Sequence, residues 1–143
     1  MGLDQYAYVA NKANQREEYF EAAVWDPVSS EWFHPTMSQP QEIAYWRKHP
    51  NLHGWMNRLW DRKGRPGIDE QQDTSFNGIE LELTWQDIED LEQAVTHKQL
   101  PTTSGFFFGR DADEEYYEQD LRFVKEARAE LFLGLKVFYN SSW

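Results

Sequence analysis

The chain has 143 residues and a formal net charge of −11, and it contains seven Trp, seven Tyr, nine Phe and no Cys. The lack of Cys excludes disulfides, thiolate metal ligands and cysteine nucleophiles. The acid excess argues against direct nucleic-acid binding, which needs a basic surface, and no apolar run is long enough to cross a membrane. The length predicts a single domain spanning residues 1–143.

The first third of the chain predicts a strand, a long loop and a helix. Residues 3–10 alternate apolar and polar side chains, as a short strand does. Prolines and serines crowd residues 25–40, so this segment is expected to be a long loop. Residues 40–48 look helical, and this helix would end before Pro50, because the residue preceding a proline disfavours the helical conformation.

A second helix is predicted over residues 50–64, because proline is tolerated in a first turn and apolar residues then recur at helical spacing. Its expected buried stripe is Leu52, Trp55, Met56, Leu59 and Trp60. Residues 76–83 alternate as a strand does. Thr84 and Asp87 then form an acidic capping box, which predicts the start of the next helix.

The C-terminal part predicts a buried strand, a long helix and a last strand. Residues 105–109 read Gly-Phe-Phe-Phe-Gly, which is typical of a core strand rather than of a phosphate loop. The acidic residues 111–115 suit a helix start better than a calcium loop, and the helix runs to about residue 133. Residues 136–139 complete an α+β fold: a small, mixed or antiparallel sheet with about four helices packed on it.

Two histidines at i, i+4 spacing are the first candidates for chemistry. His49 and His53 would share one helical face and could hold a metal ion. A third ligand, such as His34, Asp4 or Asp61, would have to join them. The alternative is structural, with His49 capping the helix and His53 making one hydrogen bond. We expect no metal ion and no cofactor, because only two ligands are visible and no cofactor motif is complete.

The segment over residues 45–55 is the predicted binding surface. An arginine guanidinium suits carboxylate or phosphate and stacks on rings, so Arg47 could hold a small anionic ligand. Arg47 could instead pair with an internal carboxylate. The predicted ligand-binding residues are Asp4, Tyr45, Trp46, Arg47, Lys48, His53 and Trp55. No catalytic residue is identified, because the chain has no nucleophile elbow.

Several motifs recur in the same order in a known group of proteins. They are Met1-Gly2-Leu3-Asp4-x-Tyr6, Tyr45-Trp46-Arg47-Lys48 with His53-x-Trp55, Leu100-Pro101 with Gly105-Phe106-Phe107-Phe108-Gly109, and a terminal Ser-Trp. On these motifs the chain resembles a family of small uncharacterised proteins of tailed phages, including phages of marine cyanobacteria. The resemblance implies a phage origin and a place in the host cytoplasm. It implies no established activity, cofactor or catalytic residue.

Three functions are compatible with the sequence. The favoured one is a non-enzymatic binding protein that acts on a host or phage protein through aromatic anchors in the 25–40 loop. These anchors are Trp25, Trp32 and Phe33. The second is a small-molecule pocket or enzyme built on Asp4, Arg47 and His53. The third is an acidic decoy for a nucleic-acid-binding protein. Whether the chain is an enzyme, and whether it forms oligomers, stays open at this point.

Overall fold

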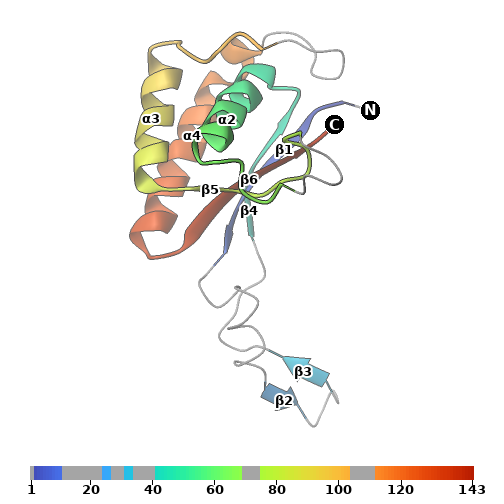
Figure 1. Ribbon diagram of the computed structural model, residues 1–143. Helices are drawn as coiled ribbons and strands as arrows, with labels where there is room; N and C mark the ends of the chain where they lie inside the picture. Colours follow the sequence, from blue (N-terminus) through green and yellow to red (C-terminus); the bar gives the residue numbers. More distant parts are fainter. Residues whose placement is uncertain (1, 11–23, 27–30, 34–40, 69–74, 104–111) are drawn as a thin grey trace.

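The computed structural model describes residues 2–10, 24–26, 31–33, 41–68, 75–103 and 112–143 (Figure 1). The elements in chain order are β1 (Asp4–Ala10), β2 (Val24–Asp26), β3 (Glu31–Phe33), β4 (Gln41–Arg47), α2 (Pro50–Arg62), β5 (Leu81–Leu83), α3 (Trp85–Thr96), α4 (Asp113–Phe132) and β6 (Lys136–Ser142). This arrangement confirms the predicted α+β class.

The main sheet has four antiparallel strands in the order β4-β1-β6-β5. β1 is central, and its first residue, Asp4, lies opposite Ser142 of β6 and Arg47 of β4. The helices α2, α3 and α4 lie together on one side of this sheet (Figure 1). Strands distant in sequence therefore become neighbours, and the first and last strands pair along their length.

The two faces of the main sheet differ in exposure. Every second residue of β1 is buried on the helix side, beginning with Gln5, while Tyr6 and Tyr8 point to the opposite side. β6 alternates in the same way, with Tyr139 buried and Phe138 partly exposed. We call the side of the main sheet away from the helices the open face.

α2 begins at Pro50 and buries the predicted stripe against the sheet. The stripe residues are Leu52, Trp55, Met56, Leu59 and Trp60.

Gly54 lies on the same helix, where a Cβ would come within 1.8 Å of Thr103 Oγ1. The Thr103 amide donates to Asn51 Oδ1 over 2.8 Å. The segment that follows α3 can therefore approach α2 closely only because residue 54 has no side chain.

α3 is stabilised by a capping box at its start and by ion pairs with α4. The Asp87 amide donates to Thr84 Oγ1 over 3.2 Å, and the Thr84 amide donates to Asp87 Oδ2 over 2.8 Å. The predicted capping box is thus confirmed. Arg128 of α4 donates to Glu89 and Glu92 of α3 over distances of 2.6 to 2.9 Å. These ion pairs join the two helices.

The helix predicted over residues 40–48 is wrong, because residues 41–47 form β4. Glutamine, glutamate and alanine in this segment are good helix formers, which is why a local interpretation favours a helix. The segment instead pairs with β1 and inserts the fully buried Trp46 into the core. Tertiary pairing overrides propensity here. The described residues consequently form three helices, not the predicted four, and the sheet is antiparallel.

Two predicted strands differ in extent from those observed. The strand predicted over residues 76–83 is limited to Leu81–Leu83. Gly78 has a φ of +71°, a left-handed conformation that interrupts an extended strand and that glycine adopts without strain. The strand predicted over residues 136–139 continues to Ser142, because it follows β1 along its full length.

The segment predicted as a loop over residues 25–40 contains part of β2 and all of β3, which form a separate antiparallel pair with Trp25 opposite Trp32. The structure describes the backbone of Trp25, Trp32 and Phe33 and not their side chains. The rest of this segment lies outside the described residues, as does the strand predicted over residues 105–109.

Candidate functional site

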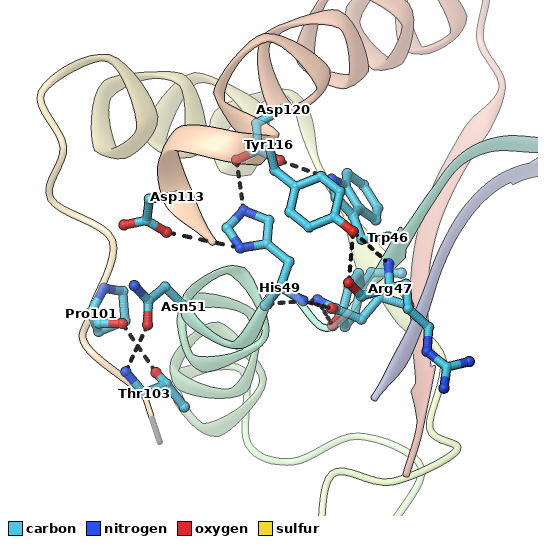
Figure 2. A network of polar contacts seen from close by, with 11 residues as sticks. Trp46, Arg47, His49, Asn51, Pro101, Thr103, Asp113, Tyr116 and Asp120 are labelled. Atoms are coloured by element: carbon cyan, nitrogen blue, oxygen red, sulfur yellow. Dashed lines mark hydrogen bonds and ion pairs between the residues drawn. The ribbon is translucent and has the colours of Figure 1, made fainter. Parts of the chain in front are cut away.

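A buried polar network joins β4, α2 and α4 on the helix side of the sheet (Figure 2). The Nε2 atom of His49 lies 2.8 Å from Asp120 Oδ2, and Trp46 Nε1 donates to Asp120 Oδ1 over 2.8 Å. All three residues are at most 1% exposed. Burial raises the pKa of Asp120 above its ordinary value, while the contacts with His49 and Trp46 oppose this shift.

His49 is held in place by its backbone and by its ring. The chain turns at Lys48, which has a φ of +59°, immediately before Pro50 begins α2. The His49 amide donates to Gln5 Oε1 over 2.8 Å, and Gln5 Nε2 donates to the His49 carbonyl oxygen over 3.1 Å. The ring of Tyr116 stacks on the imidazole with the centroids 5.0 Å apart (Figure 2). These contacts fix the position of the imidazole.

A hollow of about 1020 Å³ lies beside this network. Asp113 and Asp120 line it together with Lys98 and Tyr117. His49 has no exposed surface, and its Nδ1 atom lies 3.9 Å from Asp113 Oδ1. A molecule in the hollow would therefore not meet the imidazole. We interpret the network as structural: it holds β4 and the start of α2 against α4.

The structure brings three of the predicted ligand-binding residues together on the open face. The Tyr45 hydroxyl donates to Asp4 Oδ1 over 2.7 Å, and Arg47 Nη1 donates to the same oxygen over 3.1 Å. The hydrogen bond to Asp4 raises the pKa of Tyr45 above its ordinary value. The Arg47 side chain stays 53% exposed, and Lys48, the residue after β4, is exposed as well. This cluster is accessible to a partner.

The other predicted binding residues lie in the core on the helix side: Trp46, His53 and Trp55. His53 Nδ1 lies 2.9 Å from the Tyr139 hydroxyl, and the His53 ring stacks on Phe76 with a centroid distance of 5.4 Å. Burial lowers the pKa of His53 to about 4. Asp4 and Arg47 are on the open face, so the pocket predicted from these two residues and His53 is not assembled.

The two histidines of the i, i+4 pair have separate partners, which are Asp120 for His49 and Tyr139 for His53. His49 occupies the N-cap position of α2, as the structural alternative expected, but its side chain makes no capping hydrogen bond, because its ring reaches Asp120 of α4. His34 lies outside the described residues. Over the ranges that the structure describes, no three side chains are grouped so as to hold a metal ion.

The open face also carries aromatic residues that the sequence analysis did not select. Tyr6 lies opposite Tyr45 with the ring centroids 5.2 Å apart, and Tyr8 lies opposite Phe138 with the centroids 5.6 Å apart. Tyr6 is 36% exposed and Tyr45 is 41% exposed. We call these four residues the aromatic strip. The period-two alternation of β1 was the available signal, since it places both of its tyrosines on one side.

Carboxylates surround the aromatic strip. The Tyr8 hydroxyl donates to the carboxylate of Glu80, and burial together with this contact raises the pKa of Tyr8 above its ordinary value. Glu42 of β4 lies opposite Tyr8, so an exposed carboxylate stands on each side of this ring. Lys136 lies 3.9 Å from a third carboxylate, that of Glu82. The strip is therefore bordered by the exposed carboxylates of Glu42 and Glu80 and by two ion pairs, Asp4–Arg47 and Glu82–Lys136.

Comparisons with protein-family models, with curated proteins and with solved structures found no match to this chain. In the part of the chain that the structure describes, no helix has both the length and the apolar character needed to cross a bilayer.

Proposed function

We propose that this chain is a non-enzymatic binding protein that holds a partner protein on the open face of its main sheet. The aromatic strip is the observation that supports this function, because it spans three adjacent strands, with Tyr6 and Tyr45 exposed and Tyr8 and Phe138 partly exposed. Tyrosine and arginine dominate the energy of protein interfaces, and here Arg47 lies beside Tyr45. Because these side chains lie on paired strands, little backbone conformational entropy is lost when a partner binds.

The charge of the open face selects for a partner with a basic contact surface. Glu42, Glu80 and Glu82 are exposed around the strip, and the whole chain has a net charge of −11. The guanidinium of Arg47 is already paired with Asp4. A small anionic ligand is accordingly the weaker alternative, since the carboxylates around the strip would repel it.

The two other functions considered from the sequence have less support. An enzyme built on Asp4, Arg47 and His53 would need these side chains to converge, and they lie on opposite faces of the sheet. An acidic decoy would need a one-sided acidic surface. Arg128 instead neutralises Glu89 and Glu92 in the middle of the acidic helices.

The resemblance to tailed-phage proteins suggests which kind of partner is bound and in which compartment. The partner would be a host or phage protein, and the two would meet in the host cytoplasm. The stated binding surface does not depend on this setting, because it follows from the exposure and charge of the open face.

Affinity capture with matched variants tests the proposed function. The wild-type chain, Tyr6→Ala and Trp85→Ala are immobilised and exposed to an extract of the cells that naturally produce the chain. Trp85 is 46% exposed on α3, so it controls for the loss of an exposed ring away from the open face. We expect a protein that the wild type and Trp85→Ala retain and that Tyr6→Ala loses. Identical sets of proteins on all three chains would refute the proposal.

A further inference from the structure

We infer that the open face binds an extended, proline-containing peptide segment that carries a basic side chain. This inference rests on the proposed binding function and names the class of partner. The face is narrow: three of its strands have seven residues each, and the edge strand β5 has three. A single extended segment of chain can lie across a face of this width.

The spacing of the ring pairs matches the repeat of a polyproline II segment. The pair formed by Tyr6 and Tyr45 and the pair formed by Tyr8 and Phe138 are offset by two residues along β1 and by one strand across the sheet. These offsets place the centres of the two pairs about 8 Å apart. A polyproline II segment repeats every three residues, which is about 9 Å. Prolines three positions apart can therefore each contact one ring pair, as in other aromatic sites for such segments.

Both edges of the main sheet are partly occupied. On β4, the Tyr116 hydroxyl accepts from the Arg47 amide over 3.1 Å and donates to the Arg47 carbonyl over 2.6 Å. Gln119 Nε2 donates to the Tyr45 carbonyl. On β5, Lys63 Nζ donates to the Glu82 carbonyl over 2.8 Å. An added strand would have to displace these side chains, whereas a polyproline II segment on the face needs no ladder of backbone hydrogen bonds.

The carboxylates beside Tyr8 favour a peptide with a basic side chain. Tyr8 stands between the carboxylates of Glu42 and Glu80, and both of these glutamates are exposed. A lysine or arginine of the peptide could pair with either carboxylate while its charge lies over the Tyr8 ring. The same arrangement would repel an acidic peptide. The basic side chain thus determines which peptides bind.

Selection from a random peptide library tests this inference. The full chain is used to enrich binders from a displayed library of 12-residue peptides. Tyr6→Ala serves as the counter-selection, and the recovered peptides are sequenced and synthesised. We expect prolines three positions apart and a neighbouring Lys or Arg. The synthetic peptide should bind the wild type and Trp85→Ala equally. It should bind Tyr6→Ala at least tenfold more weakly and Glu80→Gln severalfold more weakly.

The outcomes separate this inference from the proposed function. Recovered peptides that depend on Tyr6 but lack proline or a basic residue would overturn the peptide class and leave the open face as the binding surface. Failure to enrich any peptide over the counter-selection would also overturn the inference, and the capture experiment would still decide the binding function. Equal affinity of a proline-containing peptide for Tyr6→Ala would place its site elsewhere. Thermal unfolding monitored by circular dichroism controls for the folding of each variant.

Discussion

His53 shows how burial alone changes the chemistry of a residue. Its ring is 1% exposed, contacts the Tyr139 hydroxyl and meets the terminal Trp143 edge to face with the centroids 4.7 Å apart. Burial lowers its pKa from 6.5 to about 4, since the charged form loses its hydration. At neutral pH the side chain therefore acts as a flat, uncharged part of the core. This placement removes it from the list of candidate ligand-binding residues.

Replacing His53 is expected to change the pH dependence of stability. The folded-state pKa lies below the unfolded value, so the folded state binds fewer protons between pH 6.5 and 4. The stability that depends on neutral His53 is complete above pH 6.5 and is lost as the pH falls toward 4. The full loss is about 3 kcal/mol.

Urea unfolding between pH 7 and pH 4.5 measures this effect. Relative to the wild type, His53→Phe should lose less free energy of unfolding on acidification, by up to about 1.4 kcal/mol per pH unit. The exposed residue His97 provides the control variant, His97→Gln, which should retain the wild-type slope. Parallel slopes for the wild type and His53→Phe would show that this histidine does not set the acid sensitivity.

At the scale of elements, α4 covers the end of the β4 edge at Tyr45 and Arg47. Tyr116 accepts a hydrogen bond from the backbone of Arg47 and returns one to it, much as a neighbouring strand would, and its ring packs on His49. Unpaired strand edges can pair with strands of other chains, so side chains that occupy this edge hinder such pairing. The contacts of Asp120 and Gln119 thereby hold β4, the strand that carries Tyr45, against α4.

Tyr116→Phe tests this closure. The variant keeps the ring that stacks on His49 and loses both hydrogen bonds to Arg47. We expect amide exchange at Arg47 to accelerate at least tenfold and the free energy of unfolding to fall by about 1 kcal/mol. Hydrogen exchange followed by NMR measures the first effect, with Tyr117→Phe as the neighbouring control. An unchanged exchange rate at Arg47 would mean that water or another group protects this amide.

Local patterns predicted the elements that local chemistry determines. The capping box formed by Thr84 and Asp87 and the apolar stripe of α2 were visible because each involves residues within a few turns of one another. β4 could not be recognised in this way. Its conformation depends on pairing with β1, about 40 positions earlier in the chain, and on burial of Trp46 against α4. Helix formers in the segment therefore gave the wrong answer.

The candidate site was predictable only in part for the same reason. Arg47 and Asp4 were both selected from the sequence, but nothing local showed that they face each other across two strands. Tyr6 and Tyr8 were not selected, although strand alternation places them on one side. Phe138 completes the strip from the last strand, and only the strand order brings it beside Tyr8.

At the scale of the whole molecule, the helices lie on one side of the sheet and the proposed binding surface lies on the other (Figure 1). The three described helices cover one face of the sheet, where ion pairs join α3 to α4 and the buried network joins α4 to β4 (Figures 1 and 2). The opposite face keeps its rings exposed and its carboxylates unburied. Within a chain of net charge −11, this division favours a basic partner that approaches the sheet and not the helices.

Site-specific photocrosslinking in the producing cells tests the central claim most directly. p-Benzoylphenylalanine replaces Tyr6 in one chain and the 83% exposed Phe132 of α4 in another. Because Phe132 is the more exposed of the two, random collisions would favour adducts from its position. We predict that irradiation links a partner to the chain labelled at position 6 and not to the chain labelled at position 132. Adducts that form only at position 132 would contradict the assignment of the open face as the binding surface.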